Sequence, residues 1–376
     1  MLAQLRPFKT KLFDEITEIP AVLKPAHLTG LDGLRGISII IVLLSHIFRF
    51  TYTGTFFYGE VGVHIFFVIS GFLITTILLK EKVIYGKVSL KNFYLRRTLR
   101  IFPVAYLFLV VVLILNSVFH LDIKAKSFLA AFFYFKNVPS QNISEWYTGH
   151  FWTLSIEEQF YLLAPALLVI SPNKFLKAAF AFIFLVLFLE FVVFTKIVDP
   201  LPQTFLYKAV YGIINLFGKG TVSILIGSIS SILIFKKIIT TQNLKAGYYV
   251  TFILFIAAVI IFTYSSHYII DMFVPEAFAI IIAVIIIINL NTTNLMTVIL
   301  DNKALKFIGV LSYSLYVWQE IFTYNQPWQH AFKYSDSILL NLIALSIVAC
   351  LSYFFYEKPI LKLKDKFLPK SLLVMK

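Results

Sequence analysis

Long apolar runs recur along almost the whole chain, from residue 37 to residue 356, and they constrain its fold more than any other feature. A membrane-spanning helix takes roughly 20 predominantly apolar residues. Windows of this kind lie near residues 33–52, 61–79, 101–119, 152–171, 175–195, 205–235, 248–266, 276–290, 307–324 and 336–356. The sequence therefore predicts an all-α, polytopic bundle of about ten transmembrane helices.

The composition agrees with a membrane protein of one domain. Hydrophobic residues make up 59% of the 376 residues and charged residues 14%, whereas soluble domains average about 45–50% apolar and about 25% charged. The runs leave no room for a separate soluble domain of ordinary size. We expect a cytoplasmic N-terminal segment at 1–30, a membrane domain at 31–357 and a basic cytoplasmic tail at 358–376.

The distribution of charge predicts the orientation of the chain. The net charge is +14, which in a soluble protein would suggest nucleic acid. Here the basic residues fall mainly between the apolar runs, so no nucleic-acid partner is expected. When both termini are placed in the cytoplasm, most basic residues also fall there, including the cluster from Lys80 to Arg100. This is the positive-inside pattern of a multi-pass protein in the lipid bilayer.

Two stretches depart from simple spans. The run at 205–235 is interrupted by Lys208, Gly218, Lys219 and Gly220, which indicates a broken or re-entrant segment. The apolar stretch at 128–135 is too short to span and is expected to be a re-entrant or surface element.

The segment LDGLRGISIIIVLLSHIFRF places Arg35 at the cytoplasmic entrance of the first span and His46 within it. Eleven helical steps return to within about 20° of the starting direction and rise about 16 Å, so both side chains share one face. Ionisable residues within a span are costly and are functional candidates by default. The alternatives are an Arg35 that reaches back to the membrane surface and a His46 that only hydrogen-bonds a neighbouring helix.

The segment KNFYLRRTLRIFPVAY places Arg96, Arg97 and Arg100 at the cytoplasmic start of the third span. Guanidinium groups stay charged and bind phosphate through paired hydrogen bonds. The cluster is therefore a candidate site for an anionic nucleotide. Anchoring of the topology, or contact with anionic lipids, is the alternative.

The segment GHFWTLSIEEQFYLL lies at the outer entrance of the fourth span, and its polar residues are further candidates. Glu157 and Tyr161 share a helix face because they are four residues apart. Glu157 is a candidate for orienting His46, as carboxylates do for catalytic imidazoles. His150 and Ser155 are candidates for support of the same site. No zinc-ligand spacing or glycine-rich phosphate loop occurs in the sequence, so neither a metal nor a permanently bound cofactor is expected.

Six segments occur in a fixed order: LDGLRG with an Arg, ten residues and a His, then GVHIFFVISGFLI, FYLRRTLRIFP, WTLSIEEQFYLL, LSYSLYVWQ and YEKP. Together they resemble the acyltransferase-3 family of bacterial membrane proteins, over residues 30 to 360. The resemblance implies a membrane acyltransferase domain at 31–357, in a stand-alone form without the SGNH hydrolase-like domain of some members. It also implies a location in the bacterial cytoplasmic (inner) membrane.

The resemblance further implies the reaction and the residues that perform it. Members move an acyl group, most often acetyl, from cytoplasmic acyl-CoA to a hydroxyl of a surface, secreted or lipid-linked glycan. His46 matches the family's catalytic histidine and Glu157 the first carboxylate of its SxEE element. Arg35, Arg97 and Arg100 match positions that contact the donor.

The chain departs from the family's pattern at two positions. Gln319 stands where the late helix of the family commonly has a histidine, so an acid or base role of that histidine is absent or moved. His64 stands where many relatives have an aspartate, which leaves its role open.

The residues leave two mechanisms and a rival function open. His46 would act as a general base on the acceptor hydroxyl, or would carry the acyl group itself for a time. A polytopic transporter, or an exporter of acyl groups without final transfer activity, is the alternative function. The chain shows no inverted repeat between its halves, which disfavours the transporter.

Overall fold

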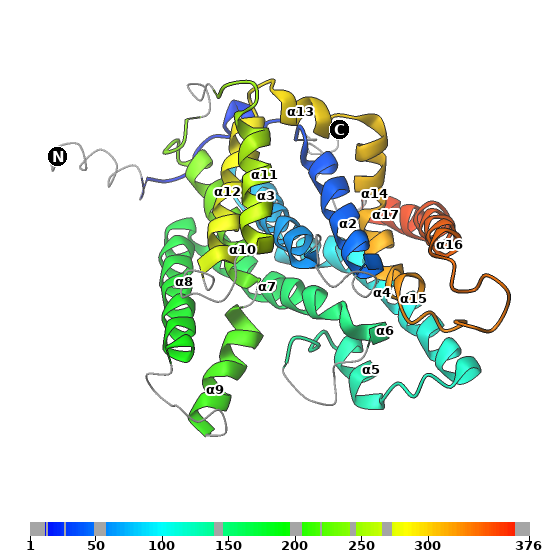
Figure 1. The fold of residues 1–376 in the computed structure, drawn as a ribbon. Coiled ribbons are helices and arrows are strands. Elements are labelled where there is room, and N and C mark those ends of the chain that lie inside the picture. The colour runs from blue at the N-terminus through cyan, green and yellow to red at the C-terminus, as the bar shows by residue number, and fades with distance from the viewer. Residues whose placement is uncertain are drawn as a thin grey trace. The chain divides into compact units, whose positions relative to one another are not determined.

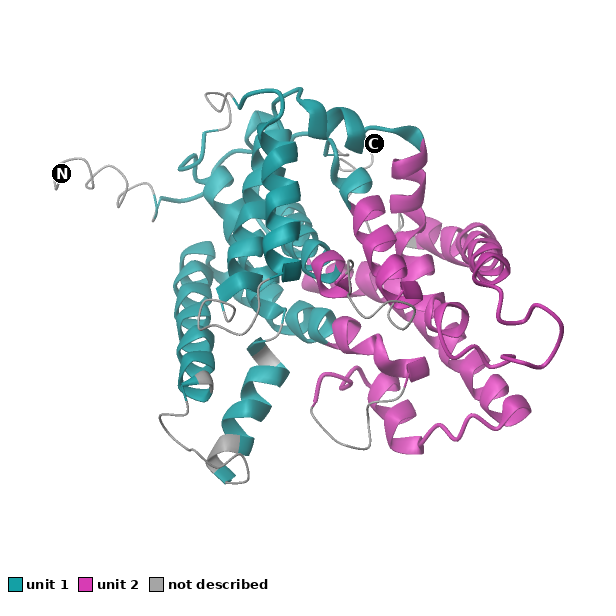
Figure 2. Ribbon diagram, in the orientation of Figure 1, with its two compact units in different colours: residues 1–34, 63–88, 156–303 teal, residues 35–62, 89–155, 304–376 magenta. Residues whose placement is uncertain are grey.

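The structure of the protein is a computed structural model. It describes residue 12 and residues 14–25, 28–48, 58–138, 146–195, 205–218, 220–240, 246–264 and 273–364. Over these residues the regular elements are all helices (Figure 1). The all-α fold class is therefore confirmed. The chain forms two compact units, which Figure 2 colours separately.

Unit 1 comprises Met1–Leu34, Val63–Val88 and Ile156–Lys303. Its elements are η1 (Ala21–Leu23), most of α3 (Gly59–Tyr85), most of α7 (Phe151–Ile170), α8 (Pro172–Phe194), α9 (Phe205–Ile213), η2 (Ile214–Gly218), α10 (Thr221–Phe235), α11 (Val250–Tyr264), α12 (Val274–Asn289) and α13 (Leu295–Leu300). Helices α10 and α11 both pack against α12, and α8 packs against α10.

Unit 2 comprises Arg35–Gly62, Ser89–Ser155 and Ala304–Lys376. Its elements are most of α2 (Leu31–Phe48), α4 (Leu90–Phe119), α5 (Ala125–Phe132), α6 (Trp146–Gly149), the start of α7, α14 (Lys303–Trp318), α15 (Glu320–Thr323), α16 (Ile338–Leu351), η5 (Ser352–Glu357) and α17 (Lys358–Lys364). The remaining residues of the predicted tail, 365–376, lie outside the described residues.

Each predicted span overlaps a helix, and six helices are long and apolar enough to cross a membrane. Those six are Leu31–Phe48, Gly59–Tyr85, Leu90–Phe119, Trp146–Ile170, Pro172–Val193 and Ile338–Leu363. The count rises to seven if the bent pair Lys208–Leu216 and Thr221–Phe235 is one span, all among the residues that the structure describes. A total of ten spans and two cytoplasmic termini stay predictions.

The interruption expected near residue 218 is confirmed by the bend between those two helices. Their axes differ by 43°. Helix α10 begins after Gly220, whose φ of 85° lies in the left-handed region that glycine tolerates best. The stretch at 128–135 contains the end of the short helix α5, in agreement with a segment too short to span.

Helix α8 presents a row of phenylalanines outward. Phe180, Phe184 and Phe188 recur every four residues along one face and are 51%, 72% and 52% exposed. So large an exposed apolar face is costly in water but favourable against lipid. The row supports a multi-pass protein whose outer surface faces the bilayer.

Helices α3 and α10 pack closely because small residues line their contact. The Ser228 hydroxyl donates to the Gly71 carbonyl (3.2 Å), and one turn further Thr76 and Ser231 join their hydroxyls (2.8 Å). A methyl group added at Gly71 would overlap the Ile224 carbonyl oxygen. Small residues allow this approach of two backbones, as in other membrane helix pairs.

Gly71→Ala is therefore expected to destabilise unit 1 by about 1–3 kcal/mol, because the added methyl group forces α3 and α10 apart. The midpoint of thermal unfolding of the purified protein in detergent measures the loss. Gly212→Ala is the matched control, since a methyl group at Gly212 meets nothing within 4 Å. Equal midpoints for the two variants would contradict the close packing described above.

Two hydrogen bonds connect α14 to other elements of unit 2. The chain continues from the end of α14 into α15, which carries a residue of the site described below. The Tyr313 hydroxyl donates to the Ile101 carbonyl of α4 (2.6 Å). The Ser314 hydroxyl donates to the Glu357 carboxylate at the end of η5 (2.8 Å). These contacts fix the direction in which the residues after α14 emerge.

Candidate active site

His46, near the end of α2, is held on both sides of its ring. Its Nδ1 lies 2.8 Å from the Val42 carbonyl oxygen, one turn earlier on the same helix. Its Nε2 lies 3.4 Å from Oε1 of Glu320, the first residue of α15. The His46 side chain is 21% exposed and that of Glu320 only 4%. The imidazole is therefore accessible while its carboxylate neighbour is buried.

These contacts decide which nitrogen of His46 is available for chemistry. A carbonyl oxygen only accepts hydrogen bonds, so the contact with Val42 requires the proton on Nδ1. In the neutral ring Nε2 then carries the lone pair. A proton that arrives at Nε2 makes an imidazolium, which the Glu320 carboxylate stabilises by its opposite charge.

Glu320 also lies close to a second imidazole. Oε1 of Glu320 is 3.8 Å from Nδ1 of His150, which is buried between α6 and α7. The Trp146 indole N–H donates to the Glu320 backbone carbonyl (2.8 Å). The Trp146 ring lies edge-on to His46, with ring centroids 5.7 Å apart. Unit 2 thus places two imidazoles, one carboxylate and one indole within a few ångströms.

The surroundings of His150 are largely aromatic. Its ring is edge-on to those of Phe108 (5.2 Å) and Tyr316 (5.6 Å). The Tyr316 hydroxyl donates to the His150 carbonyl (3.1 Å) and contacts the Thr153 hydroxyl (2.6 Å). An apolar environment strengthens electrostatic interactions, so the Glu320 charge acts strongly on both imidazoles.

Glu157 and Tyr161, the carboxylate and phenol predicted from the sequence, lie together in unit 1. The Tyr161 hydroxyl donates to Ser70 (2.8 Å), and the Ser70 hydroxyl donates to Glu157 (2.8 Å). Ser70 lies in one of the six segments but was not among the predicted site residues. The orienting role of Glu157 toward His46 stays a prediction.

Ser155 has a structural position in unit 2. Its hydroxyl donates to the Phe151 carbonyl (2.8 Å) and accepts the backbone N–H of Lys136 (3.0 Å). The Lys136 ammonium in turn donates to Ser127, whose hydroxyl contacts Thr148 (3.0 Å). Ser155 therefore joins the backbone of Lys136 to α7 and does not contact the His150 imidazole in these interactions.

The arginines lie on two helices of unit 2. Arg97 and Arg100 are three residues apart on α4 and share one face, whereas Arg96 is buried at 7% exposure. Arg100 interacts electrostatically with Glu357. Arg35 lies on the unbroken helix α2 that also carries His46, as the sequence predicts. Binding of a nucleotide by these groups stays a prediction.

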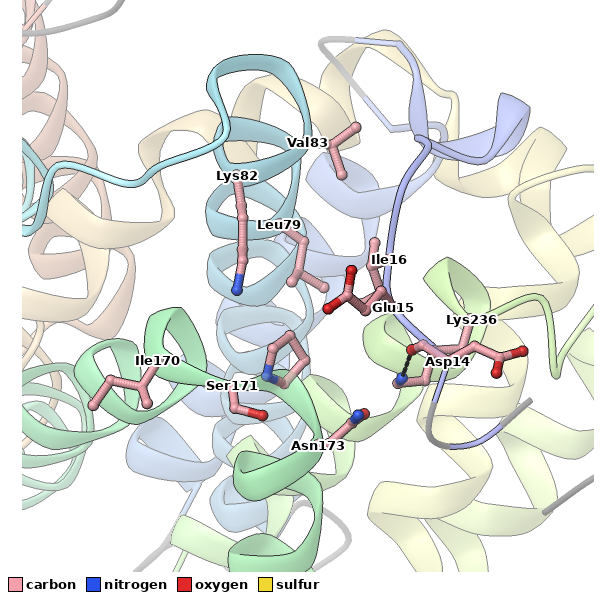
Figure 3. A pocket seen from close by; sticks show the side chains of 11 residues that line it. Asp14, Glu15, Ile16, Leu79, Lys82, Val83, Ile170, Ser171, Asn173 and Lys236 are labelled. Carbon is pink, nitrogen blue, oxygen red and sulfur yellow. Dashed lines mark hydrogen bonds between the residues drawn. The ribbon is translucent and has the colours of Figure 1, made fainter. Parts of the chain in front are cut away.

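Unit 1 contains a separate pocket of about 190 Å³, shown in Figure 3. It lies between the segment around Asp14, the end of α3 and the turn from α7 to α8. The Lys236 ammonium donates to the Asp14 carbonyl at its rim (2.5 Å), and burial lowers the pKa of this lysine, against the effect of the Asp14 charge. None of the predicted site residues lines this pocket.

Glu320 is the functional candidate that the sequence interpretation missed. A usable signal was present, because Glu320 lies inside the predicted span 307–324 and an ionisable residue within a span marks a functional candidate. Over the described residues, no three His, Cys, Asp or Glu side chains gather as a metal site.

Comparisons with known proteins agree with the motifs. Residues 28–357 match a family described as "Acyltransferase domain". The chain is 30% identical over 397 aligned positions to O-acetyltransferase OatA of Staphylococcus aureus (strain NCTC 8325 / PS 47), covering 95% of this chain and 61% of that protein. It is 37% identical over 174 positions to SACOL0978 of Staphylococcus aureus (strain COL), whose name marks it as an inferred O-acetyltransferase.

The chain spans only part of the length of these relatives. The matched region covers 28% of the SACOL0978 protein and 42% of this chain. No solved structure matches the chain significantly.

Proposed function

The chain belongs to the acyltransferase-3 family, and from this premise we propose that it is a membrane O-acyltransferase. Its donor is a cytoplasmic acyl-CoA, with acetyl as the expected acyl group. Its acceptor is a hydroxyl of a surface, secreted or lipid-linked glycan, reached from the cytoplasmic membrane. The names of the relatives, which are O-acetyltransferases, support the reaction class.

The contact between His46 and Glu320 is the observation that carries this proposal. An imidazole whose Nδ1 proton is held by Val42 presents a basic Nε2, and the carboxylate 3.4 Å away favours its protonation. General-base catalysis requires an unprotonated nitrogen within reach of the acceptor hydroxyl, and it gains from a partner that stabilises the charge that forms. A packing role for His46 would require neither feature.

The proposed reaction moves one proton and exchanges one bond. Nε2 of His46 takes the proton of the acceptor hydroxyl while the oxygen attacks the thioester carbonyl carbon. A new carbon–oxygen ester bond forms, and the carbon–sulfur bond of the donor breaks. The imidazolium then returns its proton to the CoA thiolate. Trapping of a labelled acyl-imidazole after addition of donor alone would instead favour the acyl-His46 route.

The donor is proposed to lie along α2. Its phosphates bind near Arg97, Arg100 and Arg35, and its pantetheine arm runs toward His46. The rise of α2 from Arg35 to His46 is about 16 Å, a length that such an arm covers. Both arginines of α4 and the His46 side chain belong to unit 2, which supports this assignment.

Arg97→Ala and Arg100→Ala are each expected to raise KM for acyl-CoA by about 10- to 100-fold, because a charge-assisted hydrogen bond to phosphate is lost. Little change in kcat is expected, since these groups bind the donor equally before and during reaction. Steady-state kinetics in detergent or proteoliposomes measures both constants. Lys91→Ala removes one positive charge from an exposed position of the same helix and is the matched control. An equal change in KM for all three variants would indicate a general effect of charge.

The function is tested by the glycans of a strain that lacks the gene. Envelope and secreted glycans are compared by mass spectrometry after complementation with the native gene or with an empty vector. Acyl groups that depend on the native gene identify both the acyl group and the acceptor. Equal acylation in both strains, across every glycan class, would refute the glycan acceptor. Purified protein that cleaves acyl-CoA without acylating any sugar would favour the acyl-group exporter.

A further inference from the structure

Gln319 is a fully buried amide without a partner. Its side chain is 0% exposed, and neither Oε1 nor Nε2 has a hydrogen-bond partner among the described residues. The same holds for Nε1 of Trp318 and Oε2 of Glu320, the residues on either side. Three consecutive residues therefore present unsatisfied polar atoms at the junction of α14 and α15.

Several other polar groups in this part of unit 2 have partners, although neither ring nitrogen of the buried His150 makes a hydrogen bond among the described residues. Trp146 donates to a backbone carbonyl, and the hydroxyls of Thr153 and Tyr316 contact each other. A second buried amide, that of Gln326, donates to the Phe322 carbonyl (3.3 Å). The unsatisfied side-chain atoms therefore gather at residues 318–320 and at His150, which lies 3.8 Å from Glu320, while Gln326 shows that a buried amide of unit 2 can be satisfied.

An unsatisfied buried amide is expensive, and such exceptions call for an explanation. The amide of Gln319 offers an N–H donor and a carbonyl acceptor side by side. A secondary amide of a ligand offers the complementary pair, an acceptor and a donor. Two hydrogen bonds then satisfy both groups at once. A phosphate group would not match this pair as well, because phosphate only accepts hydrogen bonds.

We propose that Gln319 binds a secondary amide group of a substrate of this enzyme. This inference rests on the proposed function, which it deepens. Glu320, which contacts His46, follows Gln319 in the chain, and consecutive Cα atoms are about 3.8 Å apart. In this proposal, the amide held by Gln319 belongs to a substrate whose reacting end lies near His46.

Two substrates supply this chemistry. In the pantetheine arm of acyl-CoA, two carbon atoms separate the thioester sulfur from the nearest amide nitrogen. In an N-acylated aminosugar, the amide lies on a ring carbon, close to the hydroxyls that accept an acyl group. Both arrangements place a secondary amide within a few bonds of the reacting atom.

The test removes the amide from the substrate and from the protein in turn. Donors are S-acetyl-N-acetylcysteamine and S-acetylmercaptoethanol, which lacks an amide, and acceptors are N-acetylglucosamine and glucose. If Gln319 binds the amide of one of these substrates, the analogue that lacks that amide is expected to have a kcat/KM with the native protein lower by about 10- to 100-fold. In Gln319→Leu this preference is expected to disappear. Gln326→Leu, which removes an already satisfied amide, is expected to retain it.

The outcomes separate the two sources. Loss of preference between the donors alone assigns the amide to the pantetheine arm, and loss between the acceptors alone assigns it to the aminosugar. Gln319→His keeps one donor and one acceptor and is expected to retain part of the preference, which a merely structural effect would not predict. Preferences that are unchanged in Gln319→Leu would overturn the proposal and leave solvent as the partner of Gln319.

A binding measurement separates this proposal from the proposed function. If the native protein transfers no acyl group from any donor, the proposed function fails. The amide site is then tested by the thermal stabilisation of the protein by coenzyme A and by N-acetylglucosamine. A ligand that binds the native state raises its unfolding temperature. A rise in the native protein that Gln319→Leu abolishes would support the site. Equal behaviour of the two proteins with both ligands would overturn it.

Discussion

His46→Ala is expected to lower the rate of acyl transfer by about 10²- to 10⁴-fold, the range that a positioned general base supplies. The substitution removes the accessible nitrogen that faces Glu320, and the second imidazole beside Glu320, that of His150, is only 1% exposed. The measurement is the transfer of labelled acyl groups by equal amounts of purified native and variant protein. A comparison of the amounts of the two proteins in the membrane checks that both are inserted equally. A change in kcat is expected to exceed any change in KM for the donor.

Ser45→Ala is the matched control for His46→Ala. Ser45 precedes His46, lies 3.4 Å from its Nδ1 and donates to the same Val42 carbonyl (2.7 Å), so its loss disturbs the same turn of α2. Only a small change in rate is expected, because Nε2 and Glu320 stay in place. A His46→Ala protein that keeps a tenth or more of the native rate would remove His46 from the chemistry.

Glu320→Gln is expected to lower kcat by about 10- to 100-fold while the protein stays folded. The substitution keeps the size of the side chain but removes the charge that stabilises the imidazolium of His46. Because the working nitrogen then becomes less basic, it stays unprotonated at lower pH, and the acidic limb of the activity profile is expected to move to lower pH. The pH dependence of kcat distinguishes this effect from a loss of packing, which would not move the profile.

Glu157→Gln provides the comparison between the two carboxylates. The sequence suggests Glu157 as the partner of His46, whereas the structure has Glu320 at 3.4 Å from the imidazole and Glu157 hydrogen-bonded to Ser70. If Glu320 is the partner, only Glu320→Gln moves the pH profile. A shift of the pH profile in Glu157→Gln and not in Glu320→Gln would indicate that Glu157 is the carboxylate that orients His46.

The helices could be read from the sequence with good accuracy. Apolar runs of the length of a membrane span are local features, and each overlaps at least one helix among the described residues. The break before α10 was also visible, because glycines and a lysine interrupt an otherwise apolar run. The alignment of Arg35 and His46 required only helix periodicity, and α2 is unbroken between them.

The family and the candidate base likewise came from the sequence, since the order of short motifs carries them. The partner of His46 could not be identified from the sequence. Glu157 and Glu320 are both carboxylates at the edge of apolar runs, and helix periodicity says nothing about which one meets a residue of another helix. The same limit applies to Gln319. Its place in the motif shows that it replaces a histidine common in the family, but not that its side chain is buried.

The sequence by itself determined the helical fold, the membrane class and the family, and it predicted His46 as the base, because each follows from local composition, periodicity or motif. Only the tertiary structure decided that Glu320 and His150 lie against that base and that Gln319 is buried without a partner. These facts depend on contacts between segments that are more than 100 residues apart in the chain. Such contacts are fixed by the packing of whole helices, which no single stretch of sequence specifies.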